Sequence, residues 1–232
     1  MLFMKTRDIL ILRFCPERFL IGLFVWMTIV GALAGCASTA QIHSTTQHRA
    51  FSLKANDLEL HGLAFITPST VTTQEEDKQA LAFTFAETLI KERPAIKCVT
   101  LSETLGAINQ NGLSEAYKLM FEEYRYTGIL RHDVLRKIGN VTGSRYVAQL
   151  KLAGFRQDSD SRFSLFGFRI LGTKQADIRL FFQIWNTQAG TIAWEASQEM
   201  TYACDDFLEK TITFRAVVVE TARKIISLLP KI

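Results

Sequence analysis

The sequence predicts an α/β (α+β) fold, a single mixed sheet of about five strands with helices packed on it. Two kinds of apolar spacing lead to this prediction. Residues 177–185, DIRLFFQIW, alternate apolar and polar side chains with the period of a half-buried strand. Residues 73–92 and 207–229 repeat apolar side chains at helical spacing. Because strands and helices alternate along the chain, the helices are expected to cover the sheet.

The first half begins with a predicted strand, LELHGLAFI, at residues 58–66, which stops before a proline that cannot continue a β-ladder. The helix at 73–92 is opened by the capping pattern TQEE and closed by Pro94. A strand, IKCVTL, follows at 96–101. Three more helices are expected, at residues 102–110, 114–125 and 132–140.

The second half contains three predicted strands and one helix. RYVAQLKLAGF at 145–155 gives the first strand. Residues 177–185 and 191–202 form a hairpin around NTQAG, where Gly190 is free to take a positive φ. The last helix is expected at 207–229, with Asp206 at its start.

The first residues have the layout of an export signal. Residues 19–35, FLIGLFVWMTIVGALAG, carry no charge and follow a basic stretch. The next fourteen residues after Cys36 hold no cluster of Lys and Arg that would stop transfer of a retained anchor, although an uncleaved anchor is the alternative by length. The four residues 33–36, LAGC, resemble the lipobox of bacterial lipoproteins.

That resemblance implies cleavage before Cys36, diacylglycerol on its sulfur and an acyl chain such as palmitate on its new amino group. The residues after Cys36 include no neighbouring aspartate, which in enteric lipoproteins implies the outer membrane. We therefore expect a protein that is anchored to the outer membrane through Cys36 and faces the periplasm.

The predicted organisation has three parts: a lipoprotein signal peptide at 1–35, a lipidated flexible tether at 36–50 and one periplasmic α/β domain at 51–232. The tether prediction depends on a run of Ser, Thr, Gln and His with hardly an apolar side chain. His43 and His48 lie in it, away from any predicted carboxylate or thiolate cluster, so no metal site is predicted.

Charge and cysteine content narrow the possible roles. The net charge of +4 is mild and gives no argument for nucleic acid as a partner. Two of the four cysteines lie outside the leader and the lipobox. Cys98 and Cys204 either form a disulfide in the oxidising periplasm or are two small buried hydrophobes.

Three segments resemble one superfamily of envelope proteins. They are GLAFITP at 62–68, VLRKIGNVTGSRYVAQLKL at 134–152 and IWNTQAGTIAWEA at 184–196. These segments are similar to the superfamily that includes the amino-terminal domain of the TolB translocation protein, the lipoprotein activators of penicillin-binding proteins and the curli secretion channel lipoprotein. The resemblance implies a docking module in the periplasm, sometimes assembled into rings.

The segment at 156–172, RQDSDSRFSLFGFRILG, departs from those relatives as an apolar loop between two strands. Exposure of an apolar loop tip to water costs free energy, so we expect the tip to be buried against another surface. It could fold back on its own core or extend the hairpin, form a protein interface, or contact the membrane. The candidate interface residues are Phe163, Leu165, Phe166, Phe168 and Ile170.

No motif for catalysis, for a metal or for a cofactor is recognised: GxSxG, HExxH, GxxxxGK[ST] and GxGxxG are all missing from the sequence. We therefore expect no enzyme and no cofactor. The predicted role is a non-catalytic binding or scaffold subunit of a cell-envelope assembly, in peptidoglycan synthesis or secretion. Its partner would be an unidentified envelope protein or a second copy of the chain. The alternative is a ring- or pore-forming subunit of an outer-membrane export apparatus.

Overall fold

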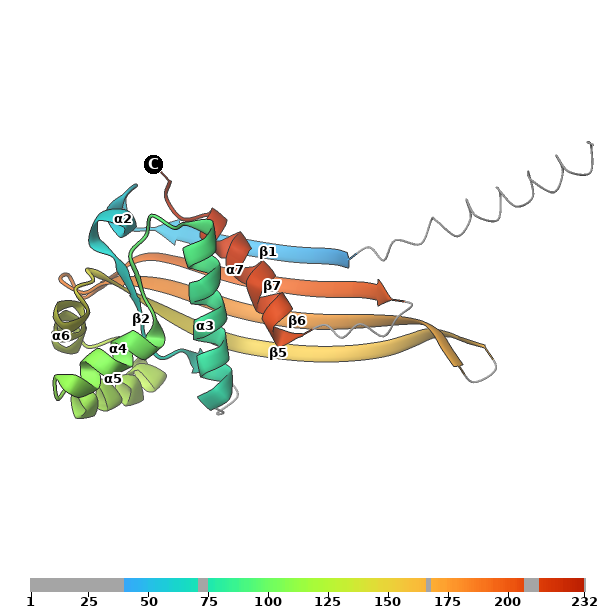
Figure 1. Ribbon diagram of the computed structural model, residues 1–232, viewed down its shortest axis with the longest axis horizontal. Coiled ribbons are helices and arrows are strands. Elements are labelled where there is room, and N and C mark those ends of the chain that lie inside the picture. Colours follow the sequence, from blue (N-terminus) through green and yellow to red (C-terminus); the bar gives the residue numbers. More distant parts are fainter. Residues whose placement is uncertain (1–39, 71–74, 166–167, 207–212, 232) are drawn as a thin grey trace, which may run out of the picture. The chain divides into compact units, whose positions relative to one another are not determined.

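The computed structural model describes residues 40–70, 75–165, 168–206 and 213–231. Seven strands form one mixed sheet in the order β1-β7-β6-β5-β2-β4, with β3 beside β5 (Figure 1). The predicted mixed sheet is therefore confirmed, with seven strands instead of about five. The strands are β1 (Ala40–Ala50), β2 (Leu63–Phe65), β3 (Ser69–Thr70), β4 (Cys98–Val99), β5 (Tyr146–Leu165), β6 (Phe168–Asn186) and β7 (Thr191–Asp206).

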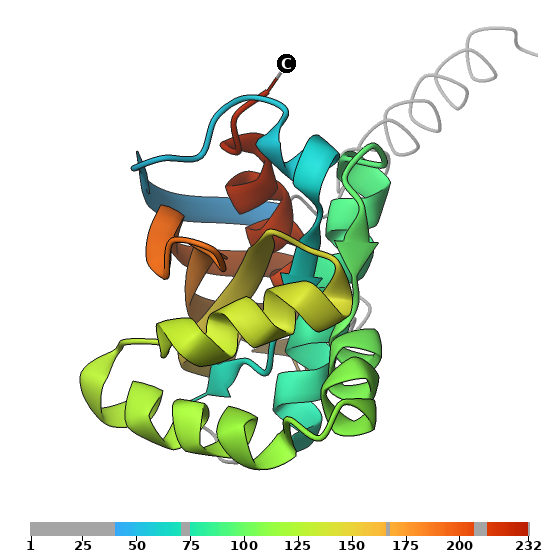
Figure 2. The same ribbon diagram turned by 90° about the vertical axis from the view of Figure 1, so that its left-hand side faces the viewer.

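Six helices of the described chain flank this sheet on its two faces. Two of them, α3 and α7, cover one face, and α5 and α6 cover one end of the other face (Figures 1 and 2). The helix α4 contributes side chains to both cores. The helices are α2 (Asp57–His61), α3 (Glu75–Glu92), α4 (Leu101–Gln110), α5 (Ser114–Thr127), α6 (His132–Thr142) and α7 (Phe214–Ser227).

The larger core lies between α3, α7 and the sheet and is built around four aromatic rings. Phe85 of α3 packs against Phe182 of β6, with ring centroids 4.7 Å apart. Phe182 also meets Trp194 of β7 at 5.9 Å, edge to face. Phe65 of β2 completes the group, and all four side chains are buried. These rings fix the face of β6 and β7 that points toward the helices.

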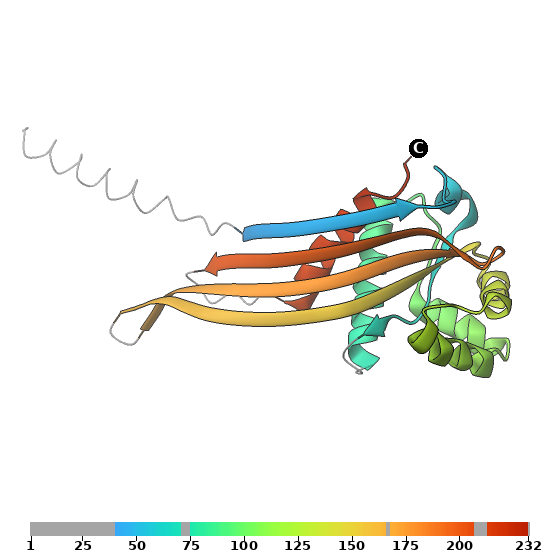
Figure 3. The ribbon, with the colours of Figure 1, turned by 180° about the vertical axis from the view of Figure 1, so that it is seen from behind.

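The smaller core lies on the other face, where α5 and α6 meet the first residues of β5. Its buried members include Met120, Ile138 and Trp185. Helix α6 comes very close to the turn that follows β6, because a Cβ on Gly139 would lie 2.5 Å from Oγ1 of Thr187. This helical cover reaches only one end of the sheet (Figure 3).

The prediction of a flexible tether at 36–50 is wrong for residues 40–50. Residues 40–50 form β1, which pairs antiparallel with β7 over eleven residues without a register shift. Two side-chain contacts help to hold it: Thr46 donates a hydrogen bond to Gln198, and His48 stacks on Trp194 at 6.3 Å. A polar edge strand is held mainly by its backbone ladder, so it carries no apolar period that the sequence could reveal.

The segment predicted as a loop at 156–172 is part of a long hairpin. Strand β5 continues to Leu165 and β6 starts at Phe168, with paired backbones up to the Leu165↔Phe168 pair. Of the alternatives, extension of the hairpin is the one that the backbone adopts. Only the backbone of residues 157–165, 168–174 and 204–206 is described, and Phe166 lies outside the described residues.

The predicted start of the last helix is wrong. Helix α7 begins at Phe214, where Oγ1 of Thr213 accepts a hydrogen bond from the N–H of Ala216. Asp206, which was expected to start this helix, ends β7 instead. Residues 207–212 and the capping residues at 73–74 lie outside the described residues.

Candidate binding face

One face of the sheet is free of described helices over most of β1, β5, β6 and β7 (Figure 3). We call it the open face. It is defined by the odd-numbered residues 43–49 of β1, 175–183 of β6 and 195–201 of β7, together with Gly154 and Arg156 of β5. The even-numbered residues of β6 and β7 point to α3 and α7, where Ile178, Phe182 and Trp194 are buried. The alternation of strand side chains therefore sorts polar residues onto the open face.

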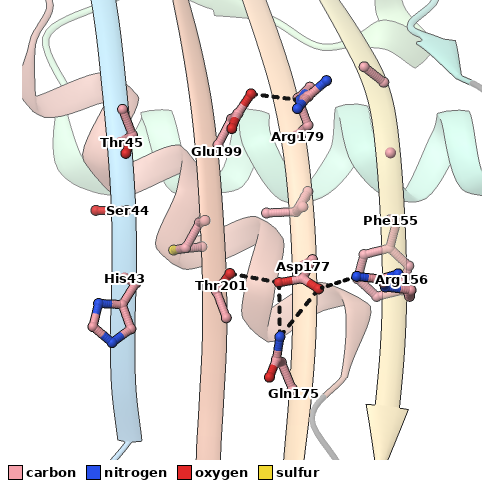
Figure 4. A pocket seen from close by; sticks show the side chains of 14 residues that line it. His43, Ser44, Thr45, Phe155, Arg156, Gln175, Asp177, Arg179, Glu199 and Thr201 are labelled. Carbon is pink, nitrogen blue, oxygen red and sulfur yellow. Dashed lines mark hydrogen bonds and ion pairs between the residues drawn. The ribbon is translucent and has the colours of Figure 1, made fainter.

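The centre of the open face is a hydrogen-bond network around Asp177 (Figure 4). Thr201 of β7 donates its hydroxyl to Oδ1 of Asp177 at 2.6 Å. Gln175 donates at 3.4 Å, and Arg156 of β5 donates to Oδ2 at 3.4 Å. These donors, above all the Thr201 hydroxyl, lower the pKa of Asp177 below its usual value. The carboxylate is thus held ionised with its oxygens engaged by three neighbours.

Further pairs of polar side chains on neighbouring strands follow along the same face. Arg179 of β6 and Glu199 of β7 form an ion pair at 2.7 Å, as Figure 4 shows. Nε2 of Gln183 donates to Glu195 at 3.4 Å. Exposed ion pairs of this kind add little to stability. What they produce is a fixed pattern of positive and negative groups across neighbouring strands.

The open face is also hollowed. A shallow hollow of about 680 Å³ lies over the Asp177 network, and a second one of about 410 Å³ lies beside it toward Arg49 and Phe181. A bulge between Leu152 and Gly154 bends β5 at the first hollow, and a Cβ on Gly154 would meet nothing within 4 Å. In the second hollow the ring of Phe181 is 38% exposed among polar neighbours. The face therefore offers polar groups, space and one aromatic surface together.

Within the described ranges, no group of three or more His, Cys, Asp or Glu could hold a metal ion. His43 and His48 lie on opposite faces of β1, because their positions differ by an odd number of residues. No helix in the same ranges combines the length and the apolar character needed to cross a membrane. Cys36, the predicted lipidation site, lies outside the described residues.

The fold does not bring Cys98 and Cys204 together. The thiol of Cys98 is free. In the sheet, Cys98 of β4 lies opposite Leu63 of β2, and Leu63 lies opposite Tyr146 at the start of β5. The backbone of Cys204 lies in the row of Ser159, thirteen residues further along β5. That separation is about 40 Å along the strand, whereas disulfide Cα atoms lie within about 7 Å. A disulfide within one chain does not fit this register.

The surroundings of Cys98 agree with the alternative of a small, partly buried apolar residue. Burial raises the pKa of its thiol to about 12, with a further contribution from the negative charge of Glu103. Glu103 is held by the cap of α4, where it accepts from the N–H of Thr100 at 2.7 Å. The thiol therefore stays protonated at neutral pH.

The open face was not among the sites predicted from the sequence. Its central strand showed the relevant signal, since Asp177, Arg179 and Gln183 alternate with buried apolar residues. No local signal in the sequence indicated the pairing of β1 with β7, which widens the face by one strand. The predicted interface residues Phe163, Leu165, Phe168 and Ile170 lie at the far end of the same hairpin.

No protein-family model matches the chain, and no curated protein matches its sequence. Several solved structures are similar in fold. The PelC dodecamer from Paraburkholderia phytofirmans is 11% identical with a TM-score of 0.43, covering 84% of this chain and 99% of that one. Lipoprotein GNA1162 from Neisseria meningitidis is 9% identical with a TM-score of 0.41, covering 72% and 98%.

The LpoB carboxyl-terminal domain from Salmonella enterica is 14% identical with a TM-score of 0.34, covering 65% of this chain and 86% of that one. All three values describe a distant likeness of fold, so what this chain does has to be inferred from its own residues.

Proposed function

We propose that this protein is a lipid-anchored binding subunit of the bacterial envelope, attached to the outer membrane through Cys36 and contacting a protein partner through the open face. The observation that carries the proposal is the hollowed, charge-patterned face of β1, β7, β6 and β5. The partner belongs to a peptidoglycan-synthesis or secretion assembly in this proposal.

The composition of the open face supports contact with a protein. A face that only meets water needs polar side chains, whereas this one adds an exposed aromatic ring, Phe181, and two hollows. Aromatic and arginine side chains are enriched in protein interfaces. Arg49 and Arg179 lie on the same face as Phe181. Ordered charges of both signs favour one docking orientation over others.

The state of the titratable groups supports binding over catalysis. A general base works best with a pKa near the working pH, which usually means a raised carboxylate pKa. The pKa of Asp177 is lowered instead, because three donors stabilise its charge. The paired carboxylate of Glu199 is engaged by Arg179. Both carboxylates are thus suited to fixed electrostatic contacts.

Site-specific photo-cross-linking in intact cells tests the proposal. A benzophenone amino acid replaces Phe181 on the open face or, as the matched control, Tyr126 of α5, whose side chain is 89% exposed. We expect a discrete cross-linked product from position 181 and none of the same mass from position 126. A product of twice the mass of the chain would identify a second copy as the partner and favour the oligomeric alternative. Absence of any product from position 181 would contradict the proposed role.

A further inference from the structure

We infer that the tip of the β5–β6 hairpin, defined as residues 162–165 and 168–170, inserts into the bilayer that holds the lipid anchor. This inference rests on the lipid attachment at Cys36 in the proposed function, and it adds a second point of membrane contact. It is drawn from the placement of the backbone and from the sequence of the tip.

The strand register places the tip at the end of the sheet where β1 begins. Ala40, the first residue of β1, pairs with Cys204 of β7. Cys204 lies in the row of Ser159, and β5 continues from there for six residues to Leu165. At about 3.3 Å per residue the tip projects about 20 Å beyond the row of Ala40. Figure 1 shows the hairpin extending past the other strands.

The length of chain between the anchor and β1 limits how far the first residue of β1 can be from the membrane. Cys36 precedes Ala40 by four residues. Four residues span at most about 14 Å, so an acylated Cys36 brings the row of Ala40 to within that distance of the lipid head groups. The projection of the tip exceeds this reach. Because the tip lies at the end of the sheet where β1 begins, it can reach the bilayer that holds the anchor.

The sequence of the tip fits the boundary between head groups and acyl chains. Phe163, Leu165 and Phe168 are apolar and lie between two arginines, Arg162 and Arg169. Arginine side chains at the edge of an apolar segment can extend to the head groups while their neighbours enter the hydrocarbon. The tip itself holds no acidic residue; Asp160 of β5 and Asp206 of β7 lie in the rows of residues 160 and 161, just behind it.

The protein's own core ends before the tip. Phe155 of β5 packs edge to face on Phe214, the first residue of α7, with centroids 5.1 Å apart. Strand pairing then continues for ten residues beyond Phe155, to the Leu165↔Phe168 pair. In the described part of the chain no helix lies beside those last pairs (Figure 3). None of the described helices is placed to cover apolar residues there, and the bilayer that holds Cys36 in the proposed function is a surface within reach.

Tryptophan quenching in vesicles tests this inference on the full-length, membrane-purified protein. The protein is reconstituted in phosphatidylethanolamine–phosphatidylglycerol vesicles with and without bromine atoms on the acyl chains. Leu165→Trp adds a probe at the tip, and Thr45→Trp adds the control probe on β1. The other tryptophans of the described chain, Trp185 and Trp194, are buried in the cores and give a constant background.

We expect brominated lipid to remove most of the emission added by Leu165→Trp and to leave the emission of Thr45→Trp and of the parent chain unchanged. Phe168→Trp, an aromatic exchange, repeats the measurement if Leu165→Trp does not fold. An acylated protein whose tip probes are not quenched overturns the inference and leaves the proposed function standing. A protein without acyl chains at Cys36 overturns the anchoring step of the proposed function itself.

Discussion

Phe182→Ala is expected to lower the free energy of unfolding by about 3 to 5 kcal/mol, the usual cost of removing a buried phenylalanine ring. Phe182 is fully buried and contacts both Phe85 and Trp194. Its loss leaves a cavity between the sheet and α3, which the surrounding rings can fill only in part. Urea denaturation followed by tryptophan fluorescence measures the change, because Trp194 borders the cavity.

The matched control is Phe181→Ala, the next residue on the same strand. Phe181 lies on the open face and is 38% exposed, so its removal is expected to lower the free energy of unfolding by about 1 kcal/mol, well below the loss for Phe182→Ala. Equal losses for the two variants would show that the two faces of β6 have been assigned wrongly. The pair therefore tests the register of the sheet as well as its packing.

Cys36→Ala is expected to abolish lipid attachment completely. Without the sulfur there is no acceptor for diacylglycerol, and the signal at 1–35 is not removed by the lipoprotein route. The product should keep the mass of the full precursor and should remain with the inner membrane through its apolar segment, residues 19–35. Intact-mass spectrometry of separated membrane fractions measures both properties.

Cys15→Ala provides the control for this experiment. Cys15 lies inside the predicted leader, so its replacement should leave the mature product and its location unchanged. If Cys36→Ala gives a protein with the same mass and fractionation as the parent apart from one sulfur atom, the chain is not lipidated at position 36.

Helices were predicted best from the sequence, because their apolar period is local. The helix ending at Glu92 and the three that follow were expected within one or two residues of α3, α4, α5 and α6. Besides the start of the last helix, one further local prediction was wrong. Residues 57–61 form the short helix α2 instead of the start of a strand, because Asn56 turns the chain with a positive φ and Leu58 is buried.

The extent of the sheet could not be predicted in the same way, because strand pairing is not local. Strand β1 has no apolar face, and only its alignment with β7 makes it part of the sheet. The far part of β5 and the start of β6 were predicted as an apolar loop, although their backbones are paired. The open face depends on both segments. A site formed across four strands was therefore visible only as the alternation around Asp177.

Photo-cross-linking from position 181 in a chain that also carries Gly154→Trp tests most directly whether the open face is where the partner binds. A Cβ on Gly154 meets open space and its φ is not in the left-handed region, so the indole can fill the hollow over Asp177 without disturbing the sheet. Gly106→Trp on α4 is the matched control, since its Cβ also meets nothing within 4 Å. We predict that Gly154→Trp removes most of the cross-linked product while Gly106→Trp leaves it at the parental level. An undiminished product with Gly154→Trp, in a protein that is folded and present at normal amounts, would contradict binding through this face.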